Sequence, residues 1–359
     1  MRKPKVSILM SVYNGERFVC RAIESMLQQS FRDFEFIIID DGSADGTGEK
    51  LAGFSDRRII RIKNGANLGL AKSLNTGLKI ARGKYIARLD ADDVAARERL
   101  QLQVSYLEQN PGVGIVGSYA AYETPSQRLL HRYPAGDCEI CWWLLFNNAF
   151  AHPSVMFHKS LVDISGPYRD DFTYAQDYEF FVRFSRVALT ANLPKALVTG
   201  TAGTHRISEQ FGDRQSEFAY RVSDSQISNL LERPAGAEAT RGIWALWSFS
   251  PHAADVDIGA SIEESAAGVM ELLEKFEFYY VRLRKYCLHE SETRRQLKRL
   301  RKRVIARLHY NAAGRFIRLS RPEAARRSLV KVLANRPGLF LRPGQRRAFA
   351  GLFIKGLAQ

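Results

Sequence analysis

The sequence contains only four cysteines in 359 residues and no long apolar run. Four cysteines are too few for a disulfide scaffold in a chain of this size, which favours a reducing, cytoplasmic setting. No apolar segment approaches the roughly 18 residues that a membrane-spanning helix needs, so a transmembrane protein is excluded. The apolar stretch 6–12 is too short for a signal peptide and runs into a polar turn, so we expect no secretion signal.

A P-loop is missing as well, because no GxxxxGK[ST] motif occurs, and P-loop enzymes therefore lose support. Cys138 and Cys141 form a lone CxxC that no second cysteine pair or histidine cluster completes. We expect these two residues to be structural cysteines and not part of a zinc site.

Acidic residues are scarce at the C-terminal end. Residues 281–359 hold 22 Lys and Arg against three acidic residues, a local net charge of +19 within a chain of net charge +15. The first 280 residues therefore carry −4, so a mildly acidic body precedes a strongly basic tail. Such a tail favours phosphate-bearing partners.

Strand and helix signals alternate over the first half of the chain. Short β-rich runs occupy residues 6–12, 34–39, 59–62 and 85–89, and helical spacing of apolar residues covers 16–29 and 71–81. This alternation predicts an α/β fold with a mostly parallel, Rossmann-like sheet flanked by helices. From about residue 211 the pattern becomes helical, over 216–232, 262–310 and 312–335. We therefore expect one α/β domain over 1–210 and a helical extension over 211–359, strongly basic from about 281.

Polar residues follow three of the predicted strands, at the edge where ligands bind in such sheets. Tyr13 follows the first strand and the pair Asp40 and Asp41 the second. The segment 40–47 either forms only a turn and a helix N-cap, with Ser43 or Asp45 as the cap, or its carboxylate pair also binds the edge of a base on which Tyr13 stacks. The fourth strand ends in the acidic turn Asp90–Asp93, which is either a surface turn or a site for Mg²⁺ or Mn²⁺.

Several motifs, in this order, closely resemble those of the family 2 glycosyltransferases, which have the GT-A fold. The resemblance covers about residues 4–210 and implies transfer of a sugar from a nucleotide diphosphate donor, with inversion at the anomeric carbon. The motifs are VSILMSVYN (6–14), IIIDDGSADGT (37–47), NLGLAKSLNTG (67–77), GKYIARLDADD (83–93), HPSVM (152–156), GPY (166–168) and AQDYEFFVR (175–183).

On the donor side, the resemblance implies a role for each matching residue. Tyr13 and Asp41 would hold the nucleobase, commonly uracil, with Asp40 beside them. Asp90 would lie near the ribose. Asp92 would bind the Mn²⁺ or Mg²⁺ that bridges the two phosphates, and Asp93 is a further candidate ligand. The loop that contains His205 and Arg206 would clamp the diphosphate.

On the acceptor side, Asp177 matches the carboxylate that deprotonates the acceptor hydroxyl, although a helix N-cap is the alternative. The family commonly has Glu-Asp here, whereas this chain has Gln176 before Asp177. Glu179 is the fallback base, though a helix would turn it away from Asp177. His152 either lines the acceptor side or is a structural histidine before Pro153.

The sequence thus predicts a metal-dependent, inverting glycosyltransferase that uses a nucleotide sugar, with UDP favoured. The acceptor would be a glycan or a lipid-linked sugar, in surface polysaccharide or glycoconjugate synthesis. The alternative is a non-catalytic nucleotide-sugar-binding protein that its basic tail tethers to a membrane or to nucleic acid. A nucleotidyltransferase, which releases pyrophosphate, is a further enzyme alternative.

The basic tail has its own alternatives. Between Arg294 and Arg307, eight basic residues surround apolar residues that recur at helical spacing: Leu297, Leu300, Val304 and Leu308. Such a helix either docks its apolar stripe on the body, binds anionic lipid or binds a nucleic-acid backbone. An enzyme with lipid-linked acceptors favours peripheral attachment to an anionic membrane over nucleic-acid binding.

Overall fold

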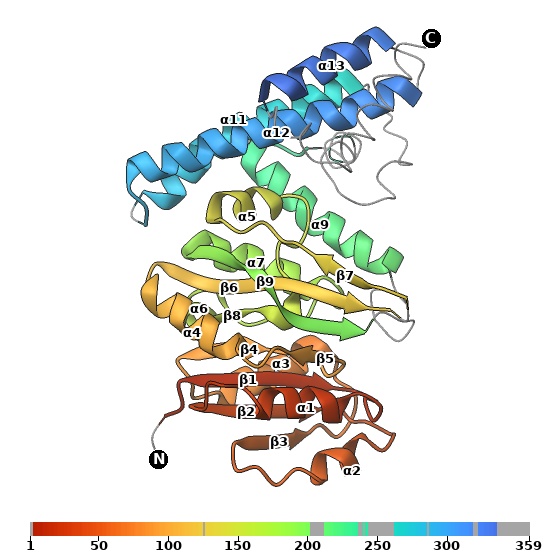
Figure 1. Ribbon diagram of the computed structural model, residues 1–359, viewed down its shortest axis with the longest axis vertical. Helices are drawn as coiled ribbons and strands as arrows, with labels where there is room; N and C mark the ends of the chain where they lie inside the picture. The colour runs from red at the N-terminus through yellow and green to blue at the C-terminus, as the bar shows by residue number, and fades with distance from the viewer. Residues whose placement is uncertain are drawn as a thin grey trace. The chain divides into compact units, whose positions relative to one another are not determined.

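The computed structural model describes residues 3–124, 126–201, 212–235, 240, 242, 262–285, 287–318 and 322–335 (Figure 1). The chain divides into two compact units, Met1–Val222 and Ser223–Gln359. The division falls within helix α9 (Gly212–Leu231). The boundary expected at residue 210 lies outside the described residues.

One sheet organises the first unit. Within the described residues it has nine strands in the order β3-β2-β1-β4-β8-β6-β9-β5, with β7 beside β6. The strands are β1 (Val6–Val12), β2 (Phe34–Asp40), β3 (Ile59–Lys63), β4 (Tyr85–Arg88), β5 (Asp93–Ala95), β6 (Val113–Glu123), β7 (Arg128–His131), β8 (Met156–His158) and β9 (Leu189–Thr201).

The first four strands form the predicted parallel layer. The end of β1 is in register with the end of β2, where Val12 pairs with Asp40, so the loops after both strands meet at one edge. β8 then pairs antiparallel with both β4 and β6, while β9 runs parallel to β6. The sheet as a whole is therefore mixed, because the short β8 extends it beyond β4 as an antiparallel strand.

Helices flank this sheet, as the alternation of signals predicts. They are α1 (Val19–Leu27), α2 (Thr47–Ala52), α3 (Leu70–Ile80), α4 (Arg99–Gln109), α5 (Asp137–Trp143), α6 (Ser160–Ser165) and α7 (Gln176–Val187), together with the 3₁₀ turn η1 (His152–Ser154). The predicted helix over 16–29 begins later, because the residues before Val19 form a turn that hydrogen-bonds to another loop.

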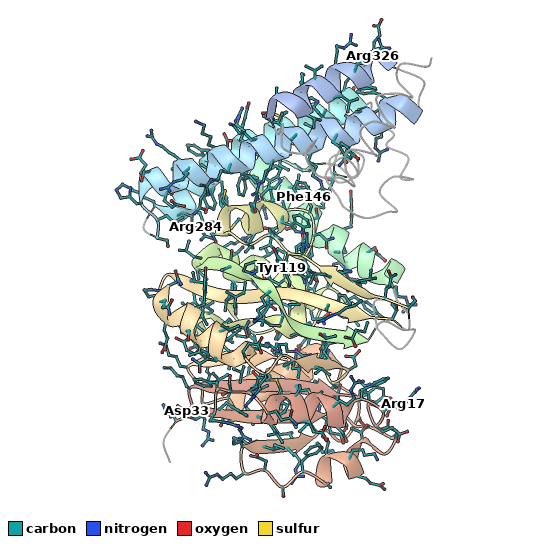
Figure 2. All side chains as sticks on the ribbon, in the orientation of Figure 1. Arg17, Asp33, Tyr119, Phe146, Arg284 and Arg326 are labelled. Atoms are coloured by element: carbon teal, nitrogen blue, oxygen red, sulfur yellow. The ribbon has the colours of Figure 1, made fainter. Side chains whose placement is uncertain are left out.

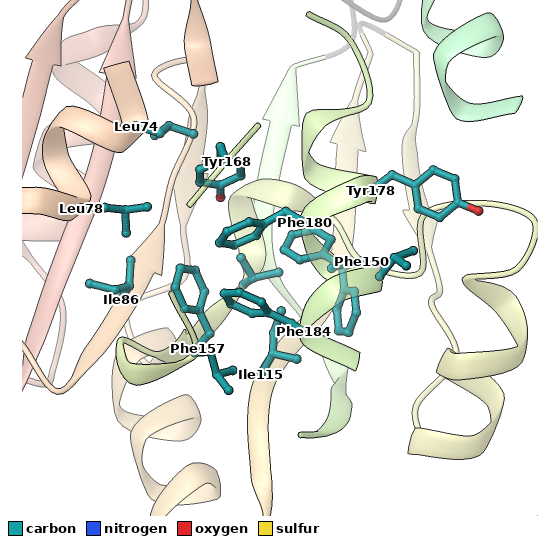
Figure 3. Close-up of a cluster of buried hydrophobic side chains, with 14 of the residues drawn as sticks. Leu74, Leu78, Ile86, Ile115, Phe150, Phe157, Tyr168, Tyr178, Phe180 and Phe184 are labelled. Atoms are coloured by element: carbon teal, nitrogen blue, oxygen red, sulfur yellow. The ribbon is translucent and has the colours of Figure 1, made fainter. Parts of the chain in front are cut away.

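A cluster of aromatic rings anchors α7. Phe180 stacks on Tyr168 with 4.0 Å between ring centroids. Phe184 contacts Phe157 of β8 edge-on, with 5.2 Å between the ring centroids. Figure 3 shows these rings gathered in the buried cluster that also contains Ile115. Burial of such rings contributes most of the local stabilisation and fixes the N-terminal end of α7, which lies in the candidate site.

The second unit is helical. Its described helices after α9 are α11 (Ile262–Arg284), α12 (Glu290–Arg318) and α13 (Pro322–Asn335). The stretch predicted as helical over 262–310 is divided into two helices. The Arg284 carbonyl accepts hydrogen bonds from the amides of Cys287 and Leu288 at the end of α11, and the His289 carbonyl accepts the first hydrogen bonds of α12. The predicted apolar stripe of α12 is buried, as its helical spacing indicates: Leu297, Leu300, Val304 and Leu308.

None of the helices in the described ranges combines the length and the apolar character that crossing a membrane requires.

Candidate active site

The loops after β1 and β2 are tied together by hydrogen bonds. The Asn14 amide donates to Ser43 Oγ at 3.0 Å, and the Ala44 amide donates to Asn14 Oδ1 at 2.9 Å. The Gly15 amide donates to Thr47 Oγ1 at 2.8 Å. Tyr13 begins this paired segment and is 50% exposed. The two loops therefore present an aromatic ring at the carboxyl edge of the sheet, where it can stack on a flat ligand.

Asp40 and Asp41, by contrast, are buried within this edge. Asp40 accepts from the Ser43 amide at 2.9 Å. Asp41 is 2% exposed and accepts from the Asn64 side chain at 2.7 Å and from the backbone amides of Leu68 and Gly69 at 2.9 and 3.0 Å. The carboxylate of Asp41 thus holds the loop 64–69, and Tyr13 is the more accessible of the two residues expected to meet a nucleobase.

Two buried arginines lie under the acidic turn. Arg88 donates to Asp90 Oδ1 at 2.5 Å and also bonds to the Leu89 carbonyl. Arg99 donates to the Arg88 carbonyl at 2.6 Å. Burial lowers the pKa of Arg99 to about 9, although the charge of Asp93 opposes the shift. The guanidinium groups offset the repulsion among the carboxylates of the turn.

The carboxylates of the turn have different environments. Asp93 is buried and opens β5, paired with Gly200 of β9, and Asp90 is bound by Arg88. Asp92 is the carboxylate between them, and it is partly exposed. Within the described part of the chain, no three His, Cys, Asp or Glu side chains group to hold a metal ion. One accessible carboxylate suits a Mg²⁺ or Mn²⁺ ion that takes its other ligands from water and from a diphosphate.

Asp177 lies in the first turn of α7 and is partly buried. Its Oδ2 accepts from Asn148 Nδ2 at 2.7 Å, and its Oδ1 accepts from the Tyr178 amide at 2.9 Å. Phe150 donates its amide to Asn148 Oδ1 at 3.1 Å, which turns the NH₂ group of Asn148 toward Asp177. Ala175, just before α7, has φ 56°, a left-handed conformation that is uncommon for a residue with a side chain. The chain is therefore held in an unusual geometry where Asp177 is presented.

The pKa of Asp177 is raised to about 6. Burial is the largest cause, and the negative charge of Asp90 acts in the same direction. The Tyr178 amide and the charge of Arg88 oppose the shift. A carboxyl group with this pKa is mostly ionised at neutral pH and is a better proton acceptor than an ordinary aspartate.

Glu179 has a different role from Asp177. It forms a bidentate pair with Arg183, with both N–O distances 2.8 Å. Arg183 also donates to the carbonyls of Gly166 and Pro167. Glu179 therefore ties α7 to the preceding turn, as expected for a side chain that the helix directs away from Asp177. Gln176, where the family commonly has Glu, is buried.

His152 and Tyr168 form a buried pair, with 3.0 Å between His152 Nε2 and the Tyr168 hydroxyl. Burial lowers the pKa of His152 to about 3, so the ring is neutral, and burial raises the pKa of Tyr168. The charges of Arg88 and Asp90 act on both residues as well as on Asp177. The end of β4, the turn η1 and the start of α7 therefore lie close to one another in the fold.

The structure thus brings Asp90, Asp177 and His152 near one another, while Asp41 and Glu179 make hydrogen bonds that hold neighbouring segments. His205 and Arg206 lie outside the described residues. Sequence reasoning missed Asn148, whose role depends on a loop that reaches α7 from a distant part of the chain. The only signal for it is its position four residues before His152.

The family model "Glycosyl transferase family 2" matches residues 7–163. A sequence from Haemophilus influenzae named an uncharacterized glycosyltransferase is 34% identical over 244 residues, which are 64% of this chain and 75% of that protein. The chain belongs to glycosyl transferase family 2. The predicted family is confirmed, and so is the class of enzyme, a glycosyltransferase with a nucleotide-sugar donor.

Two further comparisons bear on this family 2 glycosyltransferase. The Escherichia coli protein WfgD, named a UDP-Glc:alpha-D-GlcNAc-diphosphoundecaprenol beta-1,3-glucosyltransferase, is 32% identical over 173 residues, 48% of this chain and 66% of WfgD. The crystal structure of S. aureus TarS 1-349 in complex with UDP-GlcNAc has a TM-score of 0.53 at 16% identity and covers 90% of each chain. This likeness supports the predicted GT-A fold with its C-terminal helices.

Proposed function

We propose that the enzyme transfers a hexosyl or N-acetylhexosaminyl group from a UDP-sugar, with inversion, to a glycan or lipid-linked acceptor during surface polysaccharide or glycoconjugate synthesis. The observation that carries this proposal is the position of Asp177. Its carboxylate is oriented by Asn148 and has a pKa of about 6, and it lies close enough to Asp90 for the negative charge of Asp90 to raise that pKa. A base and a donor-binding turn in one place are what a direct displacement at the anomeric carbon needs.

The donor side rests on Tyr13 and the acidic turn. Tyr13 offers an exposed ring for a base, and we assign Asp90, which Arg88 holds in place, to the ribose. UDP is favoured because WfgD is named for a UDP-Glc donor and TarS is crystallised with UDP-GlcNAc. Asp92 is the residue that would hold a Mn²⁺ or Mg²⁺ ion, which when bound offsets the negative charge on the departing diphosphate.

The acceptor side rests on Asp177. In its ionised form the Oδ2 or Oδ1 atom accepts the proton of the acceptor hydroxyl as the oxygen attacks the anomeric carbon, a step worth typically 10²–10⁴-fold in rate. Asn148 holds the carboxylate in place, and the buried pair His152–Tyr168, near enough for the charge of Asp177 to act on Tyr168, adds no charge of its own. Attack from the side opposite the diphosphate gives inversion.

The lipid-linked acceptor follows from the name of WfgD, whose acceptor is a sugar on a diphosphate-linked polyprenol. This part of the proposal concerns substrate class only, since WfgD matches 48% of this chain.

The test is release of nucleoside diphosphate from a panel of UDP-, GDP- and dTDP-sugars, with Mn²⁺ and with a diphosphate-linked GlcNAc acceptor. We expect UDP release that depends on the acceptor. Release of pyrophosphate would indicate a nucleotidyltransferase instead. Thermal stabilisation by UDP-sugars without any turnover would indicate a non-catalytic binding protein.

A further inference from the structure

The described part of α12 has one strongly basic side. Six basic side chains on it are exposed, and we call them the basic face: Arg294, Arg295, Lys298, Arg299, Lys302 and Arg303. They form two rows in which neighbours are four residues apart, a spacing that places them on the same side of a helix. The whole helix contains ten basic residues and two acidic ones.

The opposite side of α12 is buried by packing. Its apolar stripe, which includes Leu300 and Val304, is buried within the helical unit, so the basic face is not needed to pack the helix. Arg301, which is not part of the face, pairs with Glu277 of α11 at 2.8 Å.

Two acidic residues of α12 pair with members of the basic face. Glu290 pairs with Arg294, and Glu292 pairs with Arg295 at 2.9 Å. Both pairs are solvent-exposed, and such pairs hold their partners weakly. The six basic side chains therefore keep a positive surface that a negatively charged partner can approach.

Large apolar side chains are exposed on the same helical unit. Phe278 of α11 is 66% exposed, with the Arg282 guanidinium 5.7 Å from its ring centroid. Val330 of α13 is 61% exposed and lies in sequence between the exposed Arg326 and Lys331. Figure 2 labels Arg326 on α13, where its side chain projects from the helix. Basic side chains combined with exposed apolar ones are typical of helices that lie on a membrane surface.

We infer that the basic face is a docking surface for anionic phospholipid membranes. The lipid phosphates supply the negative charge, and the exposed apolar side chains favour lipid over nucleic acid, whose backbone binds through charge and offers no apolar layer. The inference rests on the charges and exposure of the helical unit and does not depend on the proposed reaction.

The test uses the full chain and vesicle flotation. Vesicles of phosphatidylcholine with phosphatidylglycerol should carry the protein at low salt and release it at high salt, because screening shortens the reach of each charge. Vesicles of phosphatidylcholine alone should carry far less. The triple variant Lys298→Glu, Arg299→Glu, Lys302→Glu should bind anionic vesicles at least about 100-fold more weakly. The corresponding Gln variant should show a smaller loss.

The matched control reverses three exposed basic residues of the first unit, Arg21→Glu, Arg57→Glu and Lys79→Glu, which changes the net charge equally. We expect its vesicle binding to stay within about threefold of the parent chain, because these charges lie outside the basic face. Circular dichroism confirms that each variant is folded. Nucleoside diphosphate release without vesicles, measured in parallel, separates a failure of this inference from a failure of the proposed function.

Three results would overturn the inference. The first is equal binding to neutral and anionic vesicles. The second is an equal loss in the control variant, which would make net charge alone responsible. The third is tighter, salt-sensitive binding to RNA than to anionic vesicles, which would assign the face to nucleic acid.

Discussion

Asp177 is subject to opposing influences that together set its protonation. Burial and the charge of Asp90 raise its pKa, whereas hydrogen bonds from donors such as the Tyr178 amide favour the charged form. Asn148 adds a donor at 2.7 Å on the other carboxylate oxygen. The balance leaves a carboxylate that is ionised near neutral pH and still basic enough to accept a proton.

Replacing Asn148 should therefore shift the pH dependence of the reaction. In Asn148→Ala the ionised form loses a hydrogen bond, so the pKa of Asp177 rises and the acidic limb of kcat/KM moves to higher pH by about one unit. The control is Asn110→Ala, the same change at a residue whose side chain donates to the Tyr106 carbonyl of its own helix at 2.8 Å. A uniform loss of kcat/KM with an unmoved acidic limb would mean that Asn148 only supports the fold.

Asp177 should also reduce stability at neutral pH. Its folded-state pKa of about 6 lies above the ordinary aspartate value of 3.8, so the folded form binds the proton more tightly. Stability therefore falls as pH rises from about 4 to 6, and the cost is fully present above 6.

Asp177→Asn removes this cost because the amide does not ionise. Relative to the parent, we expect the variant to gain about 1–2 kcal/mol more unfolding free energy at pH 8 than at pH 4. Denaturant unfolding at both pH values measures the difference. The same gain at both would show that the carboxylate is not destabilised by its surroundings.

Asp92 is predicted to bind the divalent cation together with the donor diphosphate. Asp92→Ala should abolish stabilisation by UDP-sugar with Mn²⁺ and lower turnover by at least about 100-fold, because charge on the departing diphosphate would no longer be offset. Asp163→Ala, at an acidic residue of α6, is the control. Full activity in a chelator would remove the metal role.

At the scale of elements, the donor edge depends on how closely two loops approach. Gly42 has φ 75°, and a Cβ there would lie 2.5 Å from the backbone carbon of Ala66. The neighbouring Asp41 holds the same loop through the amides of Leu68 and Gly69. Backbone geometry and a buried carboxylate thus fix one wall of the site.

Gly42→Ala should consequently lower the Tm of the first unit, Met1–Val222, by at least about 4 °C, which corresponds to roughly 1–2 kcal/mol for a unit of this size, and weaken UDP-sugar binding. Gly65→Ala, in the facing loop, is the control, because a Cβ at Gly65 meets no atom within 4 Å. Equal effects of the two substitutions on Tm and binding would contradict this account.

The parallel strands could be predicted because each is a local apolar run that a polar turn ends. The strand predicted over 34–39 corresponds to β2 (Phe34–Asp40), for example. The antiparallel pairing of β8 with β4 could not be predicted, because it joins segments about 70 residues apart and depends on packing, not on a local sequence pattern. The same reason hid Asn148, whereas Asp177 could be predicted as a candidate because it lies in a recognisable motif.

The hydrogen-bond partners of buried carboxylates could not be predicted from the sequence either. Asp41 and Glu179 are candidate site residues in the sequence, and their hydrogen-bond partners, the loop 64–69 for Asp41 and Arg183 for Glu179, come from the structure alone. Residue type and spacing indicate which carboxylates lie near a site, and only the hydrogen bonds show which of them serve the fold.

At the scale of the whole molecule, positive charge is concentrated toward the C-terminal end of the chain. The first 280 residues carry a net charge of −4, and the remaining residues carry +19. Counted by unit, Met1–Val222 carries +3 and Ser223–Gln359 carries +12, so the helical unit is the strongly basic one. This division suits separate tasks, reaction in the first unit and attachment in the second. The two tasks can be tested apart, because vesicle binding and diphosphate release are independent measurements.

The central claim is that Asp177 is the base of an inverting sugar transfer. The measurement that tests it most directly is UDP release from a UDP-sugar by Asp177→Asn and Glu179→Gln, with donor affinity measured in parallel. We predict that Asp177→Asn keeps donor affinity within a few-fold of the parent and transfers at least about 100-fold more slowly. Glu179→Gln should lose stability and keep turnover. An active Asp177→Asn beside an inactive Glu179→Gln would contradict the account.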